Sequence, residues 1–140
     1  MQAAFESRDE RLAYALLRVV IGTNLMMHGI SRILGGPGEF AAKLVMQFEH
    51  APLPAWSVWA FALTLPAIEA GLGFLLLIGL RTRAALIAAS ALIVVLTFGS
   101  ALVQDWAQAA IQLTYAVVYA ALLFLCRYNG WSVDAWMERR

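Results

Sequence analysis

The chain alternates between four long apolar stretches and short polar connections. The apolar stretches cover residues 12–33, 55–80, 83–103 and 107–126. At ~1.5 Å of rise per residue, each is long enough to cross a hydrocarbon core of ~30 Å. A segment facing lipid must satisfy its backbone polar groups internally, so each is expected to be an α-helix. The pattern predicts an all-α integral membrane protein, a four-transmembrane-helix bundle forming one domain over residues 1–140.

Two shorter segments are predicted to be interfacial helices. After Gly35-Gly36-Pro37-Gly38, apolar residues recur at helical spacing with polar residues between them. The apolar positions are Phe40, Ala41, Leu44, Val45 and Phe48, and the polar ones are Glu39, Lys43, Gln47 and Glu49. We expect an amphipathic helix in this first loop, either a short lid over the bundle or a surface for a partner. Near the C-terminus, Ser132 is expected to cap a second short helix carrying Trp131, Val133 and Trp136.

Composition narrows the class of protein further. Of 140 residues, 62% are hydrophobic and 14% charged, and the mean hydropathy is +0.74. Soluble domains carry roughly 25% charged residues. The net charge of +1 gives no case for nucleic-acid binding. The polar, mixed-charge segment 1–11 lacks the pattern of a cleaved signal peptide.

The basic residues predict the orientation. One side of the membrane would carry Arg8, Arg11, Arg81, Arg83, Arg127, Arg139 and Arg140. The loops on the other side have only Arg32 and Lys43. By the positive-inside rule, both termini are expected in the cytoplasm of a bacterium, with the chain multi-pass in the cytoplasmic (inner) membrane.

Glu69 is the main candidate for chemistry, because it is the one formal charge within the second apolar stretch. A carboxylate near the bilayer centre costs at least ~2.5 kcal/mol, so it is a site hypothesis and needs a partner. Counted from the cytoplasmic helix ends at ~1.5 Å per residue, Arg18 lies ~10 Å deep and Glu69 ~16 Å. Arg18 is therefore the predicted partner. Pro66 leaves the carbonyl of Ala62 free one turn before Glu69.

The other helices supply a polar stripe and small residues. Gln108, Gln112, Tyr115, Tyr119 and Cys126 form one stripe on the fourth helix, predicted to face the bundle interior. A tyrosine hydroxyl is expected on the Glu69 carboxylate. A second polar group, nearer the outer face, combines Asn24 and His28 with Gln108 and Gln112. Gly22 and Gly29 should allow a close helix approach, and Ala84, Ala88 and Ala91 are predicted to form a packing seam.

These residues leave two interpretations open. The charged pair and tyrosines either fix helix register, or line a polar cavity for a small redox-active or protonatable ligand. The ligand-binding candidates are Glu69, Arg18, Tyr115, Tyr119, His28, Asn24, Gln112, Gln108 and Arg32. With two histidines, one cysteine and no glycine-rich nucleotide loop, no metal site and no intrinsic cofactor are expected. If the chain takes part in redox chemistry, the redox group is expected to be a bound lipid-soluble quinone or to belong to a partner subunit. A quinone carbonyl could accept hydrogen bonds from His28, Gln112 or Tyr115.

Several motifs together resemble a known family. They are Leu17-Arg18-Val19-Val20-Ile21-Gly22 and His28-Gly29-Ile30-Ser31-Arg32, then Gly79-Leu80-Arg81-Thr82-Arg83 after Glu69, and finally Arg127-Tyr128-Asn129-Gly130-Trp131. In order and spacing they resemble the DoxX family of small four-helix bacterial membrane proteins. The resemblance implies a membrane subunit associated with oxidoreductases, as in thiosulfate:quinone oxidoreductase. It also implies that Arg18, His28, Arg32 and Glu69 occupy recurrent polar positions.

Three functional hypotheses follow. The first is a membrane subunit of, or accessory to, an oxidoreductase or electron-transfer complex, contacting quinone through the polar site around Glu69. The second is a non-catalytic assembly subunit of a larger membrane complex. The third is a small proton or solute pathway. Partners would be the lipid bilayer, oxidoreductase subunits or further copies of the chain; the sequence does not decide whether the chain is itself an enzyme.

Overall fold

The computed structural model describes residues 2–139, with side chains from residue 8 onward. Met1 and Arg140, the latter counted in the charge asymmetry, lie outside this range. The described chain is helical: α1 (Gln2–Leu34), α2 (Pro37–Gln47), α3 (Ala55–Ile78), α4 (Thr82–Leu102), α5 (Trp106–Phe124), a 3₁₀ turn η1 (Cys126–Tyr128) and α6 (Val133–Met137). Four of these helices are long and apolar enough to cross a membrane, which confirms the predicted fold class.

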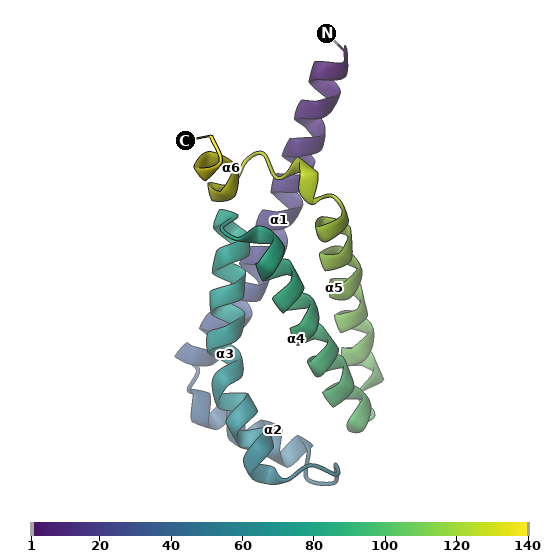
Figure 1. Ribbon diagram of the computed structural model, residues 1–140. Coiled ribbons are helices and arrows are strands. Elements are labelled where there is room, and N and C mark those ends of the chain that lie inside the picture. The colour runs from purple at the N-terminus through teal and green to yellow at the C-terminus, as the bar shows by residue number, and fades with distance from the viewer. Residues whose placement is uncertain (1, 140) are drawn as a thin grey trace.

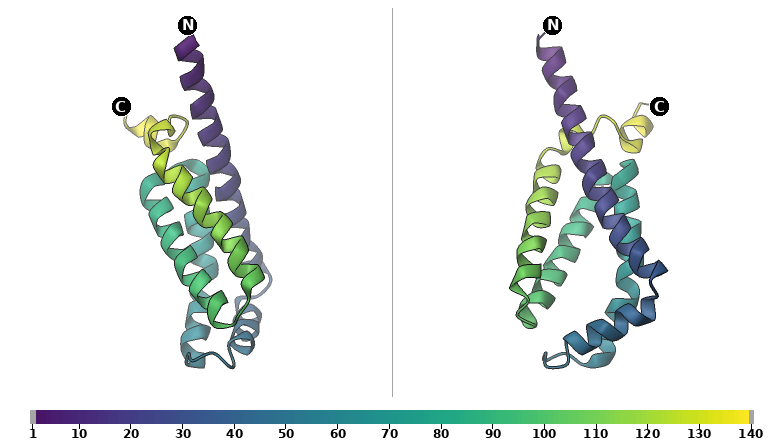
Figure 2. Two further views of the ribbon diagram at one scale, coloured as in Figure 1. Left: turned by 90° about the vertical axis from the view of Figure 1, so that its right-hand side faces the viewer. Right: turned by 180° about the vertical axis from the view of Figure 1, so that it is seen from behind.

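The long helices form two antiparallel pairs, α1 with α3 and α4 with α5 (Figure 1). Both termini and the α3–α4 connection lie at one end of the molecule, and α2 lies at the other. The two pairs stay close near the termini and diverge toward α2, as Figure 1 and the view from behind in Figure 2 show. The end near the termini is called here the terminal end, and the other the α2 end.

Glycines set the contact between α1 and α3. A Cβ on Gly22 would lie 2.7 Å from a backbone nitrogen of α3, and one on Gly73 would lie less than 3.0 Å from the backbone of Met26. Gly29 faces the backbone of α3 at Pro66 in the same way. Any larger side chain would force these helices apart, which confirms the predicted close approach at Gly22 and Gly29. The helix α3 continues through Pro66.

The apolar core fills the terminal end, where all four long helices contribute. Its buried members include Tyr14, Ile21, Leu76, Leu86, Tyr119 and Leu122. The predicted alanine seam on α4 is wrong, because Ala84, Ala88 and Ala91 are exposed. The buried small residues are Ala85 and Ala89, one position along the helix. Since one position turns a helix by ~100°, that single step exchanges the packed face for an outward one.

The helix α2 covers the α2 end as predicted. Ala41 is completely buried, and Phe40, Leu44 and Phe48 are partly buried. The charged positions on the other face, Lys43 among them, are exposed. The ring of Phe48 reaches across to Gly99 at the end of α4, where a Cβ would lie 3.3 Å from the ring. The amphipathic face therefore packs onto the bundle as a lid.

The C-terminal segment is tied to the α3–α4 loop. The Asp134 carboxylate accepts hydrogen bonds from the backbone N–H of Arg81 at 2.6 Å and of Thr82 at 2.8 Å. The Asn129 amide donates to the Thr82 hydroxyl at 2.9 Å. Ser132 accepts from the backbone N–H of Ala135 at 3.1 Å, which confirms it as the cap of α6. These bonds satisfy donors at the start of α4 that the helix itself leaves free.

Candidate functional site

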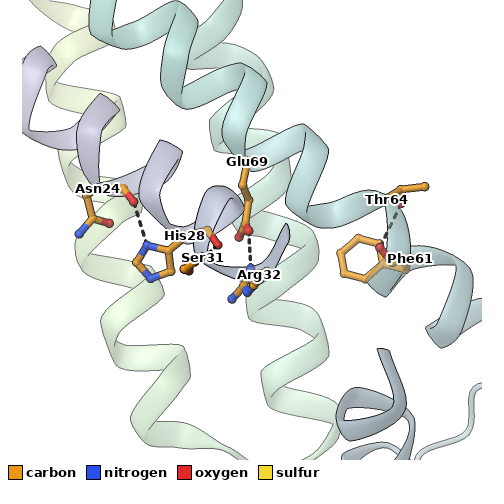
Figure 3. A network of polar contacts seen from close by, with 7 residues as sticks. All are labelled: Asn24, His28, Ser31, Arg32, Phe61, Thr64 and Glu69. Atoms are coloured by element: carbon orange, nitrogen blue, oxygen red, sulfur yellow. Dashed lines mark hydrogen bonds and ion pairs between the residues drawn. The ribbon is translucent and has the colours of Figure 1, made fainter. Parts of the chain in front are cut away.

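Glu69 is paired with Arg32, at the end of α1 (Figure 3). The Glu69 side chain is 4% exposed and that of Arg32 is 28% exposed. The guanidinium also lies over the ring of Phe40, 4.6 Å from its centroid, so α1, α2 and α3 meet at this point. It is the one ion pair among the described residues, and the predicted Arg18–Glu69 pair is wrong.

The register of α1 against α3 explains the correction. Gly22 lies opposite Gly73, and Arg18 lies opposite Leu77. Glu69 precedes Leu77 by eight residues on α3, or ~12 Å toward the α2 end, which is beyond the reach of the Arg18 side chain. The depth estimate placed the start of the first span, near Leu12, level with Leu80. In the structure, α1 is shifted toward the terminal end by about one turn relative to that alignment.

Arg18 instead closes the end of α3. Its guanidinium donates to the carbonyl oxygens of Leu76 at 2.6 Å and Leu77 at 3.0 Å, and to that of Trp131 at 2.7 Å. Arg18 is 2% exposed. Carbonyls in the last turn of a helix have no partner within it, and they carry the negative end of the helix dipole. Arg18 is therefore a structural capping residue that joins α1, α3 and the C-terminal segment.

A cavity of about 430 Å³ lies at the α2 end, between the diverging helix pairs. Phe40, Phe48 and Phe61 give it apolar walls, and α2 closes one side. Its polar lining consists of Arg32, Gln47, Ser57, Ser100, Asp105, Gln108 and Gln112. All five helices from α1 to α5 thus contribute polar groups to one mostly apolar space, the usual character of a small-molecule site.

One buried polar group in the cavity wall lacks a partner. The Gln112 amide nitrogen donates to the Ser100 hydroxyl at 3.0 Å, but its carbonyl oxygen has no hydrogen bond. Gln112 is only 5% exposed, and an unpaired buried polar atom costs about 1–3 kcal/mol. Because Gln112 lines the cavity, its unpaired oxygen is a candidate acceptor for a hydrogen bond from a bound molecule.

The two tyrosines of α5 belong to the apolar core rather than to the ion pair. Tyr119 is 1% exposed and packs in the apolar core, with Tyr115 beside it. No hydrogen bond joins either hydroxyl to Glu69 within residues 8–139, so the predicted tyrosine contact is wrong. Their shared stripe does face inward, but Tyr115 and Tyr119 sit closer to the terminal end than the cavity does.

Asn24 and His28 are also separate from the cavity. Both are exposed on α1. The ring nitrogen Nδ1 of His28 lies 2.9 Å from the backbone oxygen of Asn24, as Figure 3 shows. Ser31 donates to the His28 carbonyl oxygen at 3.0 Å, on the same exposed side. The predicted outer polar group is therefore divided: Gln108 and Gln112 line the cavity, whereas Asn24 and His28 do not.

Sequence reasoning missed four polar residues of the cavity, namely Gln47, Ser57, Ser100 and Asp105. Asp105 caps α5 by accepting from the backbone N–H of Gln108 at 3.0 Å, and its position just before an apolar run is a recognisable capping signal. Ser100 lies near the end of the third apolar stretch and had no such signal. Its pairing with Gln112 depends on the register of α4 against α5, which the sequence does not reveal.

The fold and the site define a small four-helix membrane protein with a buried ion pair and a lidded, mostly apolar cavity. A family model described as "Methylamine utilisation protein MauE" matches residues 10–113, which is more than half of the chain. The chain belongs to the MauE family. Searches of curated proteins and of solved structures found no match.

This assignment corrects the family expected from the motifs. The match is to MauE, a different family, and nothing supports DoxX. A membrane protein of the methylamine-utilisation type is consistent with an accessory role beside an oxidoreductase.

Proposed function

We propose that this protein is a membrane-embedded accessory protein of an amine-oxidising electron-transfer system, and that its cavity binds a lipid-soluble quinone or quinol. The family assignment supports the first half. The second half rests chiefly on one observation, the unpaired carbonyl oxygen of the buried Gln112 in the cavity wall.

The polar groups of the cavity suit both redox forms of such a molecule. A quinone has two carbonyl acceptors, and Arg32 keeps N–H donors that are not used on Glu69. A quinol has two hydroxyl donors, which match the carbonyl oxygen of Gln112 and the carboxylate of Asp105. The phenylalanine rings of the lid and α3 suit an aromatic head group and an isoprenoid tail. These residues bind and orient the head group; the electrons would come from a partner.

Direct binding tests the cavity proposal. The protein in phosphatidylcholine nanodiscs would be titrated with decylubiquinone and decylubiquinol by calorimetry. Gln112→Leu removes the unpaired acceptor, and we expect ~3–10-fold weaker quinol binding, the value of one hydrogen bond. Thr114→Val is the matched control, because Thr114 is on α5 but exposed and bonded only to its own helix. Absence of saturable binding to the wild type, or equal binding by Gln112→Leu, would overturn the quinone assignment.

Growth tests the accessory role separately. A methylamine-using bacterium that lacks its own MauE protein should regain growth on methylamine when it carries this chain. Growth on an unrelated carbon source provides the control. Quinone binding without restored growth would support the quinone ligand and refute the proposed role in an amine-oxidising electron-transfer system.

A second candidate, an assembly subunit without a ligand, is favoured by Asn24, His28 and Ser31. Their exposed polar side chains lie within the part of α1 apolar enough to span the membrane. Polar groups facing lipid are costly, and a partner helix would satisfy them. Asn24→Leu/His28→Leu should then reduce co-purification of partner subunits, whereas the exposed apolar pair Val20→Leu/Met27→Leu should not. Unchanged recovery of partners would refute this role.

A further inference from the structure

The terminal end carries a second hollow, remote from the cavity and outside the proposed function. Its volume is about 1180 Å³, and its lining includes Arg11, Arg81, Arg83, Arg127 and Arg139. All five side chains are exposed. Two carboxylates, Asp134 and Glu138, also line it. Basic charge therefore exceeds acidic charge where the hollow meets the ends of α1, α4 and α5.

The arginines are available to an anion. No ion pair involves any of them within residues 8–139, where the only such pair is Arg32–Glu69. Asp134 forms no ion pair with them, and both of its oxygens accept backbone N–H bonds instead. Arg127 stacks on the ring of Tyr128 at 4.7 Å and donates to its hydroxyl at 2.8 Å, which leaves its charge unpaired. Guanidinium groups bind phosphate oxygens in pairs and are well suited to such a site.

A separate apolar groove lies next along the same face of α4, on the membrane-facing side. Ala84 and Ile87 line the hollow, and Ala88 and Ala91, on the same face of α4, line a groove of about 720 Å³ between α3 and α4. The groove wall across from them includes Gly71, where a Cβ would meet nothing within 4 Å. The small residues make this face concave, and the larger apolar residues around it are exposed toward lipid.

We infer that the hollow and the groove together bind one anionic phospholipid, with its phosphate among Arg83, Arg127 and Arg81 and an acyl chain along Ala88 and Gly71. The basic hollow suits a phosphate, and the apolar groove on the same face of α4 favours a lipid over free phosphate. Basic pockets between helix ends on the cytoplasmic side bind acidic head groups in this way. The exposed alanine face of α4 is then a lipid contact.

Lipid retention by the purified protein tests the inference. Protein in detergent would be titrated with dioleoylphosphatidylglycerol or dioleoylphosphatidylcholine, and bound lipid measured by native mass spectrometry. We expect the anionic lipid to bind preferentially. Arg83→Gln/Arg127→Gln should weaken its binding by ~30-fold, since each basic residue contributes roughly fivefold. Arg8→Gln/Lys43→Gln removes the same charge outside the hollow and should bind as the wild type does.

A second pair of variants tests the groove. Ala88→Phe fills it and should lower retention of the anionic lipid, whereas Ala120→Phe, at an exposed alanine of α5, should not. Should Arg83→Gln/Arg127→Gln fail to fold, Arg83→Lys/Arg127→Lys replaces it, with a smaller loss expected because lysine cannot bind phosphate bidentately. Equal loss in the charge-matched control, no effect of Ala88→Phe, or displacement of the lipid by millimolar inorganic phosphate would overturn the inference.

Discussion

The Arg32–Glu69 pair should show a strongly asymmetric double-mutant cycle. Arg32→Gln leaves a carboxylate that is 4% exposed without its partner, a change that costs ~3–5 kcal/mol at buried pairs. Glu69→Gln leaves a guanidinium that is 28% exposed and faces the cavity, so water can reach it. That loss should lie between the buried and surface limits, at ~1–2 kcal/mol.

The double variant Arg32→Gln/Glu69→Gln restores neutrality. Two amides can hydrogen-bond to each other, so its cost should fall below the sum of the single costs by ~2 kcal/mol. The measurement is the free energy of unfolding in bicelles, from SDS titration followed by tryptophan fluorescence. Costs that add to within ~0.5 kcal/mol would show that the two side chains do not interact. Equal costs for the single variants would refute the argument from their unequal burial.

Two further predictions concern packing and pH. Gly73→Ala should destabilise the protein by ~1–3 kcal/mol, because the added Cβ meets the backbone of α1. Gly71→Ala, two residues away in open space, is the control and should be neutral or stabilising. Equal unfolding midpoints for the two variants would contradict the α1–α3 contact. At Asp134, burial would raise the pKa, but hydrogen bonds from Thr82 and Arg81 and the charge of Arg18 outweigh it, so its pKa lies below the ordinary 3.8. The stabilisation is therefore present above pH 3.8 and lost as the pH falls below it. Asp134→Asn should cost ~1 kcal/mol at pH 7, as a lost helix cap does, and the cost should shrink progressively as the pH falls below 3.8. A cost that stays constant in acid would refute the role of the carboxylate charge.

The positions of the membrane helices could be predicted because they depend on local composition. Leu12–Ile33 and Ala55–Leu80 are apolar over a length that only a spanning helix explains. The same holds for the α2 lid, whose periodicity places Ala41 inward without reference to any other element. The close helix approach at Gly22 and Gly29 was also predicted correctly, since glycine on one face of a membrane helix commonly marks a close helix–helix contact.

The partner of Glu69 could not be predicted, because it depends on the register between helices. A shift of about one turn in α1 moves Arg18 out of reach and brings Arg32 within it. Depth measured from the end of an apolar stretch carries an error of that size, since the α1 helix continues outward from Leu12 without a break. The same uncertainty hid the bond from Gln112 to Ser100, which fixes the cavity wall.

The DoxX resemblance failed for a related reason. Its motifs consist of arginines at span ends, glycines on the α1 face and a glycine before the α3–α4 loop. Each has a physical role here that many small membrane bundles would require. Gly79 has φ 71°, which favours glycine, and a Cβ there would meet Arg18. Motifs imposed by helix packing identify the architecture well and the family poorly.

The two ends of the molecule differ in how their helices are held together. At the terminal end, Arg18 and Asp134 join α1, α3, α4 and the C-terminal segment through bonds to backbone atoms. At the α2 end, the helix pairs diverge around a cavity and only the lid closes the space. Because these hydrogen bonds hold the helices together at the terminal end, the two helix pairs can diverge at the α2 end while the bundle stays intact. A molecule that binds in the cavity should therefore change the environment of α2 first. A probe attached at Lys43→Cys, on the exposed face of α2, should report that binding.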